Sequence, residues 1–496
     1  MFYHIIIFLS LLFTSMIFAE EGNVKGAAPT APTPETKLYG FIFFYGNYAD
    51  KAVMSFGKEN FNGVTAVKRQ VNASDSNSRW GFSPYATRIG FEHSLDKKMK
   101  GVAEIDFIDF DQSQGNVSVR PRLRQLFLSY KPADQFEIFA GQMWDIFAPL
   151  KPHTFNLIGK LFQQGDLGWQ REQLGFKYSP FQSLELSLAL GVTGKNTNSY
   201  PVIDVEFNST PTLGTQVKFT PIANMDFYAS FLVTNLKYRQ SGIDSTRDNT
   251  YLDYNLNTLY NVNMLPYNSA PQSAASGGAA LGMDLNFLDK RLNLRTEMNY
   301  GRNTANLNSL GLSKIQSSTF KEYYSSSRYG FITSNGSFAK DLMSSNTLNF
   351  YSIEEEGGWF SVNYKITESF SSGFYVSGAK ILNTEHLQAA DYNSLYYSQK
   401  FGTNLDFKKA GAIRENDTVA LFLSYSPESR ITFFLQGDYM KTYYKDPDRY
   451  RGLRAYIDSY DLDTNTWKFR TPIPFAQKSS AVAVARLLHY GVSYSF

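Results

Sequence analysis

The sequence predicts an all-β protein, a transmembrane antiparallel up-and-down β-barrel of 16 strands. Three observations lead to this prediction. Many segments of about ten residues alternate apolar and polar side chains, as strands with one apolar face do. Short polar turns and long hydrophilic stretches separate these segments in alternation. The chain ends inside such a segment, HYGVSYSF at residues 489–496, although chain ends are usually frayed and polar.

The composition narrows the class of protein further. The 496 residues include no cysteine, which excludes disulfides, thiolate metal sites and a cysteine nucleophile. Aromatic residues make up 16% of the chain, with 41 Phe and 33 Tyr, which is high for a soluble domain. Averaged hydropathy does not detect membrane strands that are apolar at only every second position, because their polar residues lower the average. The net charge of +3 is too small to predict a nucleic-acid partner.

The N-terminal residues predict export. The apolar run from Ile5 to Phe18 is too short for a comfortable membrane span and is followed by Ala19 and acidic sequence. Residues 1–19 are therefore expected to be a signal peptide, and an uncleaved anchor is the alternative. Residues 20–37 form a Pro/Thr/Ala-rich periplasmic leader, which leaves 38–496 as the barrel domain.

Tight turns and long connections give the strand count. Tight turns are predicted at 96–100, 131–135, 179–183, 220–225, 288–291, 367–369 and 426–430. Seven hairpins supply 14 strands, and the segment 38–48 and the final segment complete 16. Longer connections fall at 49–84, 111–119, 144–170, 193–210, 239–277, 303–357, 381–416 and 445–478. An even count with short turns on one side and long loops on the other is typical of membrane barrels, and this size encloses water.

The C-terminal segment is expected to close the barrel against residues 38–48. Tyr490, Val492 and Tyr494 would then face lipid, and Phe496 would place its ring at the membrane interface. Aromatic residues also recur beside nearly every tight turn, which predicts an aromatic girdle at that interface.

The stretch AGQMWDIF at 140–147, together with the 16-strand plan and the C-terminal HYGVSYSF, resembles Gram-negative outer-membrane porins. It is most similar to the DcaP-like trimeric porin family, in which a Gly-Gln-x-Trp-x-x-Phe segment leaves strand five and enters loop three. Gly141, Gln142, Trp144 and Phe147 match that pattern. One departure is the leader, which is too short and Pro-rich for the coiled-coil-like segment of some members.

The resemblance implies a location, partners and a function. It implies a multi-pass barrel in the cell outer membrane, in contact with its lipids and lipopolysaccharide, and a homotrimer. It also implies passive diffusion of small hydrophilic solutes through a water-filled channel, narrowed by loop three at 144–170. The aromatic terminus formed by Tyr490, Val492, Tyr494 and Phe496 would be the assembly signal that the barrel-insertion machinery reads.

Charged residues on the polar rows are the candidate pore lining. Arg120, Arg122 and Arg124 lie on one face of a strand, and a charge facing lipid would cost about 2–4 kcal/mol, so they are expected to face water. The full candidate set is Arg88, Glu104, Asp106, Arg120, Arg122, Arg124, Asp145, Lys151, Asp166, Arg171 and Lys177. Guanidinium groups in a narrow gap favour anions or dicarboxylates, and loop acids opposite them would create a transverse field. Diffusion with weak selectivity and a dedicated uncharged solute remain alternatives.

Other classes of function receive less support from the sequence. His93, His153, His386 and His489 are far apart in the chain, so neither a catalytic triad nor a metal site is predicted, and no cofactor is expected. The protein is not expected to be an enzyme. The alternative function is a barrel with a structural role, or one that mediates surface binding or adhesion through its long loops.

Overall fold

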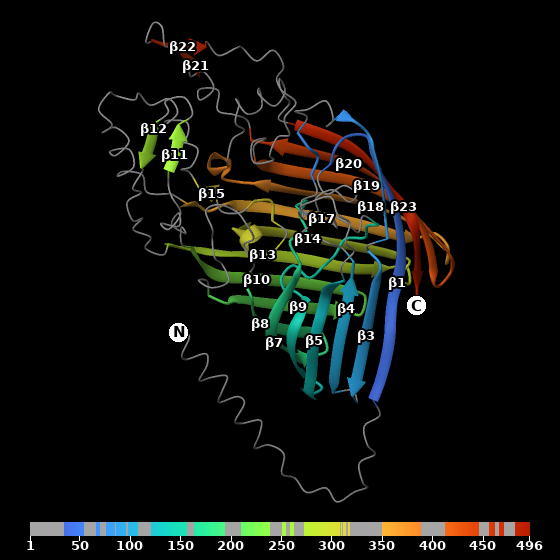
Figure 1. Ribbon diagram of the computed structural model, residues 1–496. Helices are drawn as coiled ribbons and strands as arrows, with labels where there is room; N and C mark the ends of the chain where they lie inside the picture. The colour runs from blue at the N-terminus through green and yellow to red at the C-terminus, as the bar shows by residue number, and fades with distance from the viewer. Residues whose placement is uncertain are drawn as a thin grey trace, which may run out of the picture.

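The computed structural model describes most of the predicted barrel (Figure 1). It describes residues 34–53, 66–69, 76–84, 86–95, 98–107, 121–155, 163–193, 210–238, 250–253, 258–261, 272–307, 309, 311–313, 316–317, 350–387, 412–445, 456–461, 466–470 and 482–496. The predicted signal peptide, residues 20–33 of the leader, and Arg120 lie outside the described residues.

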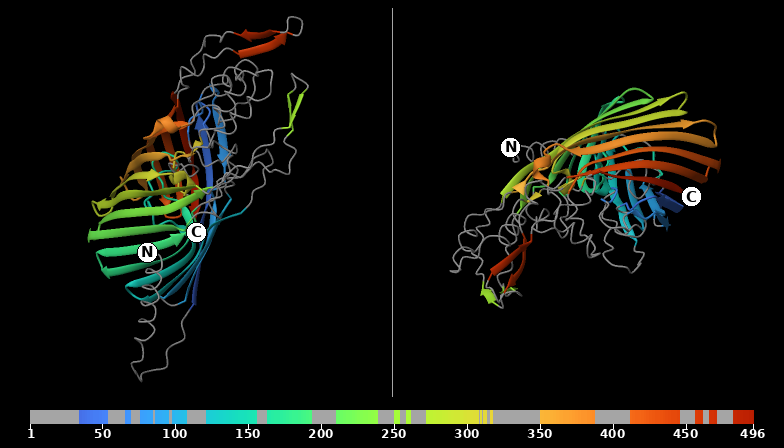
Figure 2. Two further views of the ribbon diagram at one scale, coloured as in Figure 1. Left: turned by 90° about the vertical axis from the view of Figure 1, so that its left-hand side faces the viewer. Right: turned by 90° about the horizontal axis from the view of Figure 1, so that it is seen from above.

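Sixteen antiparallel strand positions form one closed sheet, as predicted (Figures 1 and 2). The strands are β1 (Pro34–Ala49), β3 (Arg88–Leu95), β4 (Met99–Asp106), β5 (Arg122–Ala133), β6 (Phe136–Trp144), β7 (Gln170–Phe181), β8 (Leu184–Gly191), β9 (Thr212–Ile222), β10 (Met225–Tyr238), β13 (Gln272–Phe287), β14 (Leu292–Arg302), β17 (Glu354–Lys365), β18 (Phe370–Ile381), β19 (Ile413–Glu428), β20 (Ile431–Tyr444) and β23 (Val482–Ser495). Each strand pairs with its neighbours in chain order, and all seven predicted tight turns are confirmed. We call the side of these turns the turn end of the barrel and the opposite side the loop end.

The first and last strands close the barrel. β1 pairs with β23 from Phe41 opposite Ser495 to Ala49 opposite Leu487. The terminal residue extends this seam, because Phe496 N donates to Gly40 O at 3.1 Å and Gly40 N donates to Phe496 O at 3.2 Å. Lipid cannot satisfy free backbone groups, so a barrel in a membrane has to close in this way.

The second wall position is made of two strands, which corrects the prediction of a loop over 49–84. β2 (Arg79–Ser83) pairs with the second half of β1, and β3 pairs with its first half. Between them, Phe43 N donates to Thr87 Oγ1 at 3.1 Å, so a side chain replaces the missing ladder acceptor. β1 also begins at Pro34, four residues before the predicted start at 38; Pro is tolerated at the first position of a strand.

The two faces of the wall differ as the alternation predicts. Large apolar side chains are exposed on the outside of nearly every strand, including Leu281, Met298 and Leu421 at 64%, 69% and 68%. Tyr130, Tyr178, Phe181, Phe219 and Tyr425, which flank the tight turns, are among the exposed residues. Such a continuous apolar outer face matches hydrocarbon and not water. In the part of the chain that the structure describes, no helix is long and apolar enough to cross a membrane.

Short elements lie in the long connections of the loop end. β11 (Thr250–Asp253) pairs with β12 (Thr258–Asn261), β15 (Gln316–Ser317) with β16 (Phe350–Tyr351), and β21 (Tyr456–Asp461) with β22 (Thr466–Arg470). The 3₁₀ turns η2 (Thr304–Asn306) and η3 (Thr384–His386) follow β14 and β18. The sequence treats all these segments as loop, because such short strands leave no clear alternation.

Removal of Phe496 should impair barrel assembly. The deletion removes both terminal seam hydrogen bonds and an aromatic ring, while Phe496→Tyr keeps all three and serves as the control. We expect less folded barrel for the deletion, seen as loss of the heat-modifiable band in unboiled gel electrophoresis. Equal folded yield for the deletion and the control would contradict this role of the terminal residue.

Candidate functional site

Loop three, which the structure describes at residues 145–155 and 163–169, turns into the barrel and contacts its inner wall. Its ends are joined by a hydrogen bond from Asp145 N to Trp169 O at 2.8 Å. Its backbone then meets side chains of β9, β10, β14, β17 and β20 in that order. The contacts are Gln216 Nε2 to Ile146 O (2.6 Å), Ala148 N to Ser230 Oγ (3.1 Å), Leu150 N to Glu297 Oε2 (3.3 Å), His153 N to Ser361 Oγ (3.4 Å) and Phe155 N to Gln436 Oε1 (2.7 Å). The loop therefore lies inside the barrel, bound to its wall over many strands.

Aromatic stacking holds the far part of loop three. The ring of Phe155 stacks on Phe434 of β20 with centroids 4.7 Å apart, and its edge meets Phe422 of β19 at 5.7 Å. Phe434 also stacks on Phe43 of β1 at 5.3 Å. These inward-facing rings form a buried cluster next to the closing seam. The loop is thus fixed at both ends of its path.

The returning part of loop three passes close to the backbone of the wall. Asn299 Nδ2 donates to Gly165 O at 2.6 Å. Gly165 has φ of 106°, and a Cβ there would lie 2.4 Å from Gly358 O and 2.6 Å from Gly378 O. Only glycine fits both the backbone conformation and the space.

The motif residues have physical roles at the entry to loop three. Gly141 has φ of 129°, and a Cβ there would lie 2.2 Å from Leu126 O of β5. Gln142 Nε2 donates to the carbonyls of Leu123 and Arg124 at 3.1 and 3.0 Å, where β4 and β5 shift register. The Trp144 ring has the Lys151 Nζ atom 5.1 Å from its centroid and the Arg124 guanidinium carbon 5.5 Å from it. The fully buried Phe147 belongs to the apolar cluster under the loop. The motif therefore directs the chain from the fifth wall strand into the lumen.

Three arginines meet on the wall opposite this path. Arg122 makes a bidentate ion pair with Asp106 at 2.9 and 2.5 Å, and Arg124 bonds Glu104 at 2.7 Å and Asp106 at 3.2 Å. Arg88 lies opposite Asp106 in the pairing of β3 and β4. We call these five residues the arginine cluster; its three cations and two carboxylates (3 − 2) leave a net charge of +1.

The arginine cluster faces the base of loop three and keeps free donors. The guanidinium carbon of Arg122 lies 5.9 Å from the Trp169 ring, and that of Arg124 lies 5.5 Å from the Trp144 ring. Within the described part of the chain, the buried atoms Arg88 Nε and Arg124 Nη2 make no hydrogen bond. The side chain of Arg122 is 24% exposed, so it offers its charge to the lumen.

The charges of loop three are paired close to the loop itself. Arg171 Nε bonds Asp145 Oδ2 at 2.6 Å, and Lys151 Nζ bonds Asp166 Oδ1 at 2.8 Å. The carboxylates of Asp145 and Asp166 are 3% and 0% exposed. Both acids are buried in ion pairs, so they give the expected transverse field no support. Asp145 and Arg171 anchor the loop and do not line an open passage.

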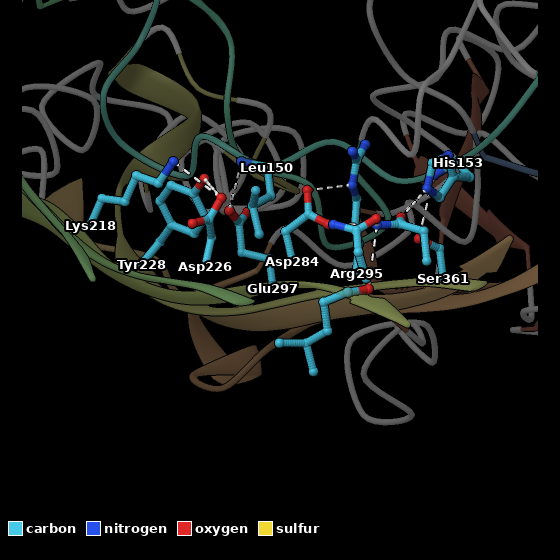
Figure 3. Close-up of polar contacts among 12 residues, drawn as sticks. Leu150, His153, Lys218, Asp226, Tyr228, Asp284, Arg295, Glu297 and Ser361 are labelled. Atoms are coloured by element: carbon cyan, nitrogen blue, oxygen red, sulfur yellow. Dashed lines mark hydrogen bonds and ion pairs between the residues drawn. The ribbon is translucent and has the colours of Figure 1, made fainter. Parts of the chain in front are cut away.

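A row of ion pairs lines the lumen at the turn end. One pair lies on each of five successive hairpins. The pairs are Glu92–Lys100 (2.8 Å), Lys131–Glu137 (3.7 Å), Lys177–Glu185 (3.8 Å), Lys218–Asp226 (3.1 Å) and Asp284–Arg295 (2.8 Å). Figure 3 shows Lys218, Asp226, Asp284 and Arg295 rising from the sheet on the same side as loop three. We call these five pairs the vestibule pairs; five cations and five carboxylates (5 − 5) give no net charge.

Only Lys177 of the vestibule pairs was expected from the sequence. The signal that could have found the others is an acid and a base on the polar rows of one hairpin, close to its turn. Alternation identifies the inward face, but it does not show that neighbouring charges cancel.

Sequence comparisons identify no relative, and structural comparison identifies the fold. No protein-family model and no curated protein matches the chain. The outer membrane channel DcaP of Acinetobacter baumannii matches with a TM-score of 0.54 and 14% identity, over 93% of this chain and 97% of that chain. OmpF of Salmonella typhi in complex with daunomycin (TM-score 0.47, 10% identity, 93% and 97% covered) and OprB of Pseudomonas putida (0.46, 10%, 93% and 94%) are less similar.

The chain has the fold of an outer-membrane porin. Two more segments narrow the loop end of this porin barrel. Leu307, which follows η2, is fully buried against Phe147 and Leu167 of loop three. Val53 and Val67, joined by an isolated bridge, pack on Met440 and Tyr444 of β20. These segments pack inward on the β10–β14 and β20–β23 sides of the barrel, whereas the arginine cluster lies on β3, β4 and β5.

We expect the docking of loop three to depend on pH through His153. Its Nε2 contacts Asn293 Oδ1, and burial lowers the pKa of His153 from its ordinary value of 6.5. The docked loop therefore binds a proton less readily than the undocked loop does. Docking should be strongest above pH 6.5 and should weaken as the pH falls through the ordinary pKa towards the lowered one.

Hydrogen exchange should detect this weakening. We expect the amides of Leu150 and Phe155, corrected for intrinsic rates, to exchange faster at pH 5 than at pH 7.5, because protonation of His153 favours the undocked loop. His153→Gln, which cannot be protonated, should remove the difference. The same pH dependence in that variant would assign the effect to another group.

Proposed function

We propose that the protein is an outer-membrane porin that lets small hydrophilic solutes diffuse passively through a water-filled channel. The observation that carries this proposal is the inverted polarity of the barrel. Its outer face is apolar, and its inner face carries five cross-strand ion pairs and a bound inner loop. A polar interior in a barrel of this size supports a hydrated passage.

We propose further that the channel prefers anions, including dicarboxylates. The vestibule pairs cancel, whereas the arginine cluster carries +1 where loop three narrows the lumen. A unit charge at 4 Å is worth between about 1 kcal/mol in water and about 4 kcal/mol near a protein surface. One excess charge therefore supports a preference and not exclusion of cations. The guanidinium of Arg122, whose side chain is 24% exposed, is the group of the cluster that a carboxylate in the lumen can reach.

The outer surface of the barrel supports the proposed surroundings of the protein, which are membrane lipid and neighbouring subunits. Ile42, Phe44, Trp80 and Phe82 are 49–62% exposed on β1 and β2. Their exposure supports burial in outer-membrane lipid and lipopolysaccharide or between the subunits of a homotrimer. We propose also that the barrel-insertion machinery recognises the aromatic terminus, as the resemblance implies.

The other functions have less support. Much of the long loops on which an adhesion or binding role would depend lies outside the described residues. Among the residues that the structure places, no three His, Asp or Glu side chains group as a metal site. We propose a channel because of the polarity of the barrel given above; that the protein is not an enzyme stays a prediction.

Planar-bilayer recording tests the proposed channel. Purified protein should produce stepwise currents, and its reversal potential in a KCl gradient should indicate anion preference. Absence of current steps would refute the channel, and cation preference would refute the role of the arginine cluster.

Arg122→Ala should move the reversal potential towards zero. It lowers the net charge of the arginine cluster from +1 to 0, while Asp106 keeps Arg124 as a partner. The control is Lys177→Gln with Glu185→Gln, which removes a vestibule pair without changing its net charge. An unchanged reversal potential for Arg122→Ala, or an equal shift in the control, would contradict the assignment.

A further inference from the structure

Arg171 joins three connections of the loop end through one guanidinium group. Its Nε donates to Asp145 Oδ2 of loop three at 2.6 Å. Its Nη1 donates to the carbonyl of Val192, just after β8, and its Nη2 donates to Leu307 O, just after η2, at 2.5 Å. Segments that lie between 21 and 136 residues from Arg171 in the chain thus share one cation.

The surroundings of Arg171 are built for this side chain. Only 2% of the side chain is exposed, although the residue lies on the lumen face of β7. Gly191 on the neighbouring strand leaves the space it occupies, since a Cβ there would lie 2.5 Å from Arg171 Cδ. A planar group with several donors can bond partners in different directions, which the single ammonium of lysine cannot reproduce.

The segments that Arg171 joins also pack on one another. Phe147, Ala148 and Leu167 of loop three and Leu307 belong to one buried apolar cluster, with Leu232 of β10 below them. Asp145 is fixed in turn, because its Oδ1 accepts from Phe147 N at 3.2 Å. Loop three and the segment at Leu307 therefore share both a polar and an apolar contact.

We propose that Arg171 is a positioning residue that makes loop three and the Leu307 segment one unit, and so sets the width of the passage. This inference rests on the proposed channel for its functional consequence. The structural part of the inference, that Arg171 holds Leu307 against loop three, does not depend on the proposed channel and is tested separately. Without the guanidinium, the two inward segments can separate, while the arginine cluster and its charge remain.

Thiol labelling tests the coupling without any transport assay. The chain has no cysteine, so Leu307→Cys introduces a single thiol at a position that is 0% exposed. We compare its labelling by a small maleimide in the folded protein in detergent, alone, with Arg171→Lys, and with Lys177→Gln. Lys177 lies on the same face of β7 and contacts Glu185 in place of a loop, so it is the matched control.

The expected result is faster labelling only with Arg171→Lys, by about tenfold or more, as for an opening equilibrium that loses charge-assisted hydrogen bonds. Equal labelling in all three proteins, or an equal increase with Lys177→Gln, would overturn the proposal. Heat-modifiability shows that each variant is folded. If Arg171→Lys does not fold, Asp145→Asn replaces it, because this change removes the charge that Arg171 binds in loop three. Faster labelling is again expected, and unchanged labelling overturns the proposal.

Single-channel recording tests the consequence for the passage. Arg171→Lys should increase open-channel current noise and leave the sign of ion preference unchanged, because the arginine cluster is intact. Noise equal to that of the Lys177→Gln control would refute a role in setting the width. Loss of current in every protein, the unmodified one included, would refute the proposed channel and leave the labelling result to decide the coupling.

Discussion

Closure of the sheet is the constraint on which the rest of the structure depends. Each backbone group that faces hydrocarbon without a partner costs several kcal/mol, so the edges of β1 and β23 must pair with each other. The seam runs as far as the terminal Phe496, whose backbone bonds Gly40 in both directions. Closure with 16 strand positions also fixes the size of the interior, which is too wide for the wall side chains alone to fill.

The described part of loop three lies in that interior, and its fit depends on small residues and on cancellation of charge. Gly165 lets the chain approach the carbonyls of β17 and β18, and Phe155 extends the stack of Phe434 and Phe43. Acids and bases of the loop pair where they are buried, and the vestibule pairs do the same along the wall. The arginine cluster is the exception, because its three cations and two carboxylates do not cancel.

The sequence predicted the wall better than the interior. A period of two residues and the tight turns are local signals, so the hairpins and the inward faces of Arg88, Arg122 and Arg124 were predictable. The hydrogen-bond and ion-pair partners of these side chains were not predictable, because alternation assigns a residue to a face and does not indicate contacts across the lumen. The joining of Asp145, Val192 and Leu307 by Arg171 spans distant parts of the chain. The strand β2 was missed because it lies in a polar stretch and is only five residues long.

The most direct test places a thiol on the passage itself. Arg122→Cys introduces the only cysteine of the chain at a side chain that is 24% exposed in the arginine cluster. During single-channel recording, a negatively charged methanethiosulfonate should react with it, lower the current in a step and shift ion preference towards cations. A positively charged reagent should lower the current and restore anion preference. Full current and unchanged preference after reaction, with labelling verified by mass, would contradict a channel that passes the arginine cluster.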